Sequence, residues 1–213
     1  MPPIRKQNRT YKKGAPFRDA RKFILICEGE REAEYFDFFD KLSQKLIVKT
    51  IAPIDDNMGQ SAPNHLRDRA SEYIEENGWE ENYDDQLWFV LDVDRWDREK
   101  INELHHLTEI TKNWFLAISN ICFEVWLYYH MNPTKIEPET SGQMKRILND
   151  QTSGGYNLNL YAPAISTAIG NSANIDNNEA GFYPANGVTK VYKLAMEVVN
   201  LLSFENGILK IEE

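Results

Sequence analysis

The 213-residue sequence is poor in the side chains that bind soft metals, with two cysteines and four histidines. Cys27 and Cys122 are too few for a zinc site of their own, and the histidines show no metal-binding spacing. A nucleophile elbow and a glycine-rich phosphate-binding loop are also missing. We therefore expect two buried thiols, and we expect His130, on an apolar helix, to be a core residue rather than a general acid.

Long hydrophobic runs are also missing. No run approaches the roughly 18 apolar residues that a membrane-spanning helix needs. The first six residues, Met-Pro-Pro-Ile-Arg-Lys, lack the apolar centre of a signal peptide. Hydrophobic residues make up 42% of the chain and charged residues 27%, as is typical of a globular protein with one good core. We expect a cytoplasmic protein without membrane contact.

Positive charge is scarce outside the N-terminal segment. The formal net charge is −9, but residues 1–22 hold eight basic groups and one acid, which leaves −16 for the rest of the chain. We predict a basic flexible arm over residues 1–21 that contacts nucleic-acid phosphates, with Lys12 and Lys13 among the contacts. The alternative is that the arm aids solubility or folds against the acidic body.

Two apolar runs end abruptly in acids. Residues 22–27 lead into Glu28-Gly29-Glu30, and residues 86–91 lead into Asp92-Val93-Asp94. Each run is typical of a parallel strand that is covered on both faces. Because ligands bind in the crevice at the carboxyl ends of such strands, we expect Glu28, Asp92 and Asp94 to converge. Three close carboxylates repel one another, so we predict a Mg²⁺ or Mn²⁺ site with oxygen ligands.

Strand and helix patterns alternate through the first part of the chain. The predicted strands are residues 22–27, 46–52, 86–92 and 114–119. The segments that follow them are predicted to be helices over 31–45 and 61–77, a loop and an exposed helix within 95–107, and a helix over 121–131. This order predicts an α/β core over residues 22–131, with a mainly parallel sheet of about four strands sandwiched by helices. Residues 132–213 predict a helical C-terminal extension packed on the core, with helices at 141–149, 160–169 and 188–204 and a polar loop at 171–178.

Four motifs, taken together, resemble those of the RloB-like family, which is found in bacterial restriction–modification and abortive-infection loci. They lie at residues 23–36, 89–95, 117–130 and 186–194, and the resemblance covers residues 22 to about 200. It implies a Toprim-like domain, the metal-binding fold of topoisomerases and bacterial primases. In such domains a glutamate follows the first strand and an Asp-x-Asp pair follows a later one, which here are Glu28 and Asp92/Asp94.

The resemblance also implies that Ser119, Asn120, Phe123 and Glu124 flank the same crevice. We interpret Asn120 as the cap of a helix beginning at residue 121, and we assign Glu124 to the catalytic site in preference to a purely structural role. The family usually has proline at position 121 and threonine near position 32, and neither departure removes a proposed ligand.

In the reaction implied by these motifs, Asp92 and Asp94 hold metal and Glu28 is either a third ligand or the general base. Ser119 and Asn120 are expected to bind substrate. Arg95 either clamps a substrate phosphate or pairs with Asp94.

Three functions are compatible with these motifs. The first is a Mg²⁺- or Mn²⁺-dependent Toprim-family nuclease acting on DNA or RNA in anti-phage defence. The second is a non-catalytic or partner-regulated subunit of an abortive-infection complex, for which the family's genomic setting suggests an ATPase partner. The third is a phosphatase of the haloacid dehalogenase type with Asp92 and Asp94 as its acid pair, which we disfavour because that pair normally follows the first strand.

Overall fold

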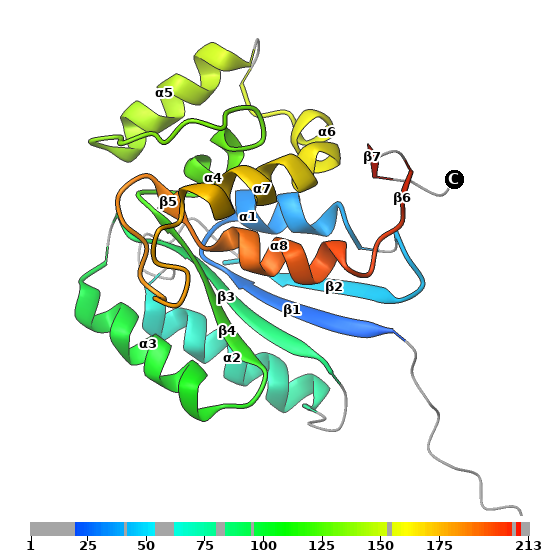
Figure 1. Cartoon of the computed structure of the whole chain (residues 1–213). Coiled ribbons are helices and arrows are strands. Elements are labelled where there is room, and N and C mark those ends of the chain that lie inside the picture. The colour runs from blue at the N-terminus through cyan, green and yellow to red at the C-terminus, as the bar shows by residue number, and fades with distance from the viewer. Residues whose placement is uncertain are drawn as a thin grey trace, which may run out of the picture.

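The computed structural model (Figure 1) describes residues 20–40, 42–53, 62–79, 84–94, 96–152, 155–205 and 208–209. Its centre is a five-stranded sheet with the spatial order β2-β1-β3-β4-β5. The strands are β1 (Arg21–Cys27), β2 (Leu46–Ile51), β3 (Gln86–Asp92), β4 (Trp114–Asn120) and β5 (Val188–Thr189). The first four strands pair in parallel, and β5 pairs with β4 in the antiparallel direction. The predicted α/β class with a mainly parallel sheet is confirmed, and β5 is an additional strand.

Helices cover both faces of the sheet, as predicted. α2 (Pro63–Asn77) and α3 (Arg98–Ile110) lie on one face, and α1 (Glu30–Asp37), α7 (Ile165–Ile175) and α8 (Val191–Val199) lie on the other (Figure 1). The remaining helices are α4 (Glu124–Tyr128), α5 (Ser141–Gln151), α6 (Leu158–Tyr161) and the 3₁₀ helix η1 (Ala162–Ala164). A short hairpin, β6 (Phe204–Glu205) and β7 (Ile208–Leu209), follows α8. None of the described helices is both long and apolar enough to cross a membrane.

The uninterrupted apolar run of β1 is explained by a core on each side of it. Phe23, Leu25 and Cys27 pack into the larger core with α1, α4, α7 and α8, while Ile24 and Ile26 pack into the second core with α2 and α3. Side chains alternate between the two faces of a strand, so a strand covered on both faces is apolar at every position.

The helix predicted over residues 31–45 is shorter than expected, because α1 ends at Asp37. Two carboxylates at the end of α1 and just beyond it bind the next strand: Asp37 Oδ1 accepts from Thr50 Oγ1 at 2.6 Å, and Asp40 Oδ1 accepts from the Val48 amide at 2.9 Å. These bonds tie the end of α1 to β2 instead of extending the helix.

The predicted cap role of Asn120 was wrong. Asn120 is the last residue of β4, and its side chain donates to the Pro184 carbonyl at 2.9 Å. The helix predicted over residues 121–131 is the shorter α4, which begins at Glu124 after Phe123 and has no side-chain cap. A cis peptide bond joins residues 120 and 121.

Two predicted boundaries in the C-terminal part were also wrong. The polar loop predicted over residues 171–178 is helical up to Ile175, because Ser172 is buried and Asn171 donates to the Tyr129 carbonyl at 2.8 Å. The helix predicted over residues 188–204 is the shorter α8, which spans Val191–Val199, since residues 188 and 189 join the sheet as β5 and residue 204 begins β6. In α7 the polar Asn171 side chain ties the helix to Tyr129, so the polarity of this segment does not mark a loop.

Gly187 sits where the C-terminal part meets the sheet. Its φ is 72°, its amide donates to the Asn120 carbonyl at 2.8 Å, and a Cβ there would lie 1.6 Å from the Ile136 carbonyl oxygen. We predict that Gly187→Ala lowers the free energy of unfolding by about 2 kcal/mol or more, as measured by urea denaturation.

Gly170 on α7 is the matched control, since a Cβ there would meet nothing within 4 Å. Gly170→Ala should raise the free energy of unfolding by about 0.5–1 kcal/mol, because alanine favours helix more than glycine does. Equal effects of the two substitutions would contradict the close contact at Gly187.

Candidate active site

The sheet changes its direction of growth between β1 and β3. The chain passes from β1 outward to β2 and then returns to place β3 on the other side of β1. Crevices at such switch points, at the carboxyl ends of the strands, are the usual ligand sites of open α/β sheets. Glu28 follows β1 directly and Asp92 ends β3, so the topology brings these two acids to the same crevice.

The Glu28 carboxylate joins the two strand ends. Its Oε2 accepts a hydrogen bond from the Asp92 amide at 2.8 Å, and its Oε1 accepts from the Trp96 indole at 3.1 Å. The sheet ladder continues past the strands, since the Glu28 amide donates to the Val90 carbonyl and the Asp94 amide donates to the Ile121 carbonyl. The positions of Glu28, Asp92 and Asp94 are therefore fixed by backbone contacts.

A pocket of about 530 Å³ opens at this point. Five residues that were predicted to lie at the crevice line it together, namely Glu28, Asp92, Asp94, Phe123 and Glu124. The other lining residues are Gly29, Glu30, Arg31, Glu32, Glu34, Cys122, Lys145 and Tyr156. The expected convergence of acids from separate strands is therefore present in the structure.

Negative charge is concentrated in this pocket. Burial raises the pKa of Glu32 to about 7, and the charges of Glu28 and Glu124 add to the rise. Burial also raises the pKa of the Asp92 carboxyl well above its usual range, and the neighbouring charges of Glu32, Glu28, Glu124 and Asp94 act in the same direction. These carboxylates disfavour one another's charged forms, and a bound cation would relieve that repulsion.

Two basic side chains offset part of this charge. Arg31 Nη1 donates to the buried Glu124 carboxylate, and Lys145 Nζ lies 3.9 Å from the same oxygen. Both cations remain about half exposed, with side-chain exposures of 42% and 51%. The Arg31 guanidinium also lies 5.3 Å from the ring centre of Tyr156. One wall of the pocket is thus cationic and aromatic.

The acids do not form a ready-made metal cage. Among the described residues, no group of three or more histidine, cysteine, aspartate or glutamate side chains is arranged to hold a metal ion. A physical reason is that both oxygens of Glu28 already accept hydrogen bonds from Asp92 and Trp96. The carboxylate oxygens that line the pocket are nevertheless the donors that hard divalent cations prefer.

Two described residues that were predicted to bind substrate, Ser119 and Asn120, do not line the pocket. Ser119 is buried, with its hydroxyl 2.9 Å from that of Thr189, and Asn120 bonds to the Pro184 carbonyl. Arg95, Lys12 and Lys13 lie outside the described residues, as do residues 1–19 of the predicted arm. Their predicted roles in substrate binding stay predictions.

The pocket also contains residues that the sequence interpretation did not assign to it. Arg31 and Glu32 lie shortly after the Glu28-Gly29 turn in α1. The position of Glu32 so close to Glu28 in the sequence could have indicated that it lies in the same pocket. Lys145 and Tyr156 come from the C-terminal part, more than 100 residues away from Glu28, and no pattern in the sequence connects them to it.

His130 and the two cysteines lie in the interior, as predicted. His130 Nδ1 donates to the Trp126 carbonyl at 3.0 Å, and Nε2 accepts from the Tyr35 hydroxyl at 2.8 Å. Burial lowers the pKa of His130 to about 4, so it is a neutral core residue. Burial raises the pKa of both thiols.

The fold and the pocket together define an α/β protein with an acid-lined crevice at the switch point of a mainly parallel sheet. A family model described as RloB-like protein matches residues 23–198. The chain therefore belongs to the RloB-like protein family, which confirms the resemblance of its motifs. Searches of curated proteins and of solved structures found no match.

The raised pKa of Glu32 predicts how stability depends on pH. Between pH 4.5 and 7 the folded protein binds more protons at this site than the unfolded chain, so stability is greatest below this window and is lost as pH rises through it. With EDTA present, we expect the ionisation of Glu32 to lower the free energy of unfolding by about 2–3 kcal/mol as pH rises through this window. Urea denaturation at pH 5 and pH 8 measures the fall.

Glu32→Gln should remove most of that fall, because the amide cannot ionise. Glu34→Gln is the matched control, because Glu34 is on the same helix and lines the same pocket but is exposed. An undiminished fall in the Glu32→Gln protein would contradict the assignment.

Proposed function

We propose that this chain is a Mg²⁺- or Mn²⁺-dependent nuclease that hydrolyses phosphodiester bonds of DNA or RNA in bacterial anti-phage defence. One observation supports the proposal most strongly: acids at the carboxyl ends of β1 and β3 and on α4 line a single pocket that also contains two half-exposed cations. Carboxylates that bind a divalent cation, placed beside cations that bind phosphate, are the parts that phosphodiester hydrolysis needs. Membership of the RloB-like family supports the defence role.

Asp92 and Asp94 are the proposed cation ligands. Mg²⁺ is commonly held by one or two protein carboxylates, with water and substrate phosphate completing its shell. A site of this kind needs no cluster of three protein ligands, so the chemistry of this donor set fits the cation. When bound, the cation neutralises phosphate oxygens and lowers the pKa of coordinated water.

The chain's other residues have separate roles in this proposal. Glu28 holds the Asp92 backbone in place through its Oε2. Glu32 is the pocket carboxyl whose pKa of about 7 suits general acid–base work near neutral pH. Glu124 keeps Arg31 and Lys145 directed at the pocket, where both cations can contact a substrate phosphate.

The first test is cation-dependent cleavage of tRNA, single-stranded DNA and duplex DNA. We expect the wild-type protein to cut at least one of them with Mg²⁺ or Mn²⁺ and not with EDTA. Asp92→Asn should lower the rate by about 100-fold or more, because it removes a charged ligand. Mn²⁺ binding, measured by calorimetry without nucleic acid, should weaken in the same variant.

Asp150→Asn is the matched control, because Asp150 is an exposed aspartate on α5 outside the pocket lining. Its rate and Mn²⁺ affinity should equal those of the wild type. Equal cutting by the wild-type and Asp92→Asn proteins would contradict the proposal. So would an inactive wild type that binds no Mn²⁺, which would favour a non-catalytic subunit that works with an ATPase partner.

The second test concerns the basic wall of the pocket. Binding is measured in the Asp92→Asn protein, which should cleave its substrate at least about 100-fold more slowly. In this background, Lys145→Gln should weaken binding of the intact substrate nucleic acid and reduce the slope of log affinity against log salt by about 1. Arg146→Gln, an exposed neighbour outside the pocket lining, should change both quantities less. Fluorescence anisotropy across a salt series measures them. An unchanged slope for Lys145→Gln would exclude its contact with phosphate.

A further inference from the structure

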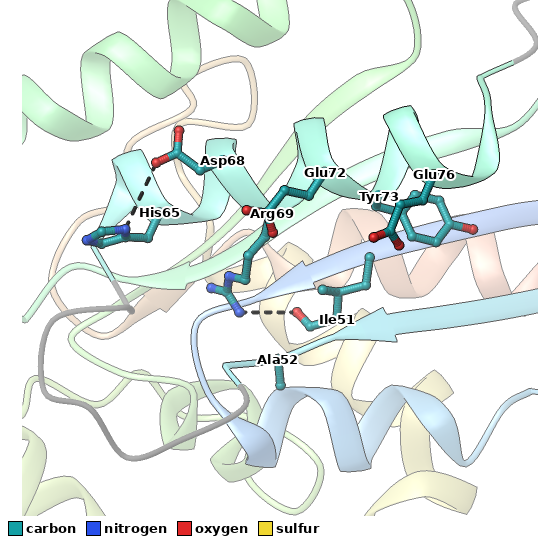
Figure 2. Close-up of a pocket in the computed structure, with 8 residues that line it drawn as sticks. All are labelled: Ile51, Ala52, His65, Asp68, Arg69, Glu72, Tyr73 and Glu76. Carbon is teal, nitrogen blue, oxygen red and sulfur yellow. Dashed lines mark hydrogen bonds and ion pairs between the residues drawn. The ribbon is translucent and has the colours of Figure 1, made fainter.

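A second pocket, of about 490 Å³, lies beside the carboxyl end of β2 and along one side of α2 (Figure 2). It is separate from the acidic pocket and shares no lining residue with it. Two rows of side chains at intervals of four residues line it, together with Ile51 and Ala52. One row is His65, Arg69 and Tyr73, and the other is Asp68, Glu72 and Glu76. Residues four apart on a helix lie one turn apart on the same face, so the rows run side by side.

Arg69 lines this pocket, and most of its N–H groups have no hydrogen-bond acceptor among the described residues. Its Nη1 donates to the Ile51 carbonyl at 3.4 Å, which is a long hydrogen bond (Figure 2). Its Nε and Nη2 are buried, and no described residue accepts a hydrogen bond from either. These two nitrogens form one edge of the planar guanidinium, whose paired N–H groups match two oxygens of a phosphate or carboxylate.

This state is unusual for an arginine with a structural role. Buried polar groups are normally satisfied by protein acceptors, and a buried charge without hydrogen bonds is unfavourable. Burial lowers the pKa of Arg69, although the charges of Glu28 and Glu72 act in the opposite direction. The fold thus holds a partly desolvated cation at the wall of a pocket, where an anionic ligand would stabilise it.

We propose that this pocket binds a small ligand that carries one phosphate monoester, of the mononucleotide class, with the phosphate on the Nε–Nη2 edge of Arg69. Among the described residues, the Ile51 carbonyl alone accepts a hydrogen bond from the guanidinium, and that bond is long. The proposal therefore includes a turn of the side chain that brings the buried Nε–Nη2 edge to the pocket. This site is independent of the nuclease proposed above.

The rest of the pocket restricts the ligand further. Tyr73 lies one turn from Arg69 and offers an aromatic ring at the distance of the sugar or base. The exposed carboxylates of Asp68, Glu72 and Glu76 can accept hydrogen bonds from hydroxyl and amino groups. Their three negative charges repel every phosphate group, so a ligand with one phosphate meets less repulsion here than a polynucleotide, which carries many. A ligand with one phosphate and several donors therefore fits, and a nucleic-acid strand does not.

The test uses adenosine 5′-monophosphate, inorganic phosphate and adenosine as probes, with EDTA present so that no cation fills the acidic pocket. We expect the nucleotide to bind the wild-type protein in calorimetry, phosphate to bind more weakly, and adenosine to bind least. Arg69→Gln should weaken nucleotide binding about tenfold or more. Tyr73→Leu should weaken binding of the nucleotide while leaving that of phosphate unchanged.

Arg67→Gln is the matched control, because Arg67 is an exposed arginine on the same helix and does not line this pocket. It should bind the nucleotide as the wild type does, and so should Asp92→Asn. Without ligand, Arg69→Gln should melt no lower than the wild type, since it removes an unsatisfied charge. Equal nucleotide affinity in Arg69→Gln and wild type, or no binding of phosphate-bearing probes at millimolar concentration, would overturn the proposal.

Discussion

The hydrogen bond from the Asp92 amide to the Glu28 carboxylate joins the ends of the two central strands. It brings an acid that follows β1 against the acid that ends β3, at the place where the sheet reverses its direction of growth. Burial raises the pKa of Asp92 and Glu32, and the neighbouring carboxylates raise it further. This arrangement is costly for an ordinary structural site, because repulsion opposes folding at neutral pH. It is understandable when the pocket binds a cation.

The C-terminal part adds to this site as well as to the sheet. β5 pairs with β4 next to the crevice, and Gly187 allows the close approach of the segment that precedes it. Lys145 on α5 reaches the buried Glu124, which also binds Arg31. Arg31 and Lys145 thus lie at the same Glu124 carboxylate, where their positive charges offset part of the pocket's negative charge.

The sequence predicted the parts of the fold that depend on local patterns. Two-sided burial of β1 and β3 produced apolar runs that ended at Glu28 and Asp92, so the strands and their acids were visible without a structure. The role of Asn120 was not predictable, because a side chain suited to a helix cap instead bonds to a carbonyl 64 residues away. The position of Lys145 at the pocket was not predictable either, because it depends on how α5 packs against α4.

Manganese-soaked crystals of the wild-type protein test the central claim most directly, because anomalous scattering locates the metal independently of activity. The account predicts a peak within coordination distance of the Asp92 carboxylate, with Asp94 as a second ligand directly or through water. The same soak with Asp92→Asn crystals should give a weak peak or none. A wild-type pocket without manganese, or a peak bound only to acids outside it, would contradict the account.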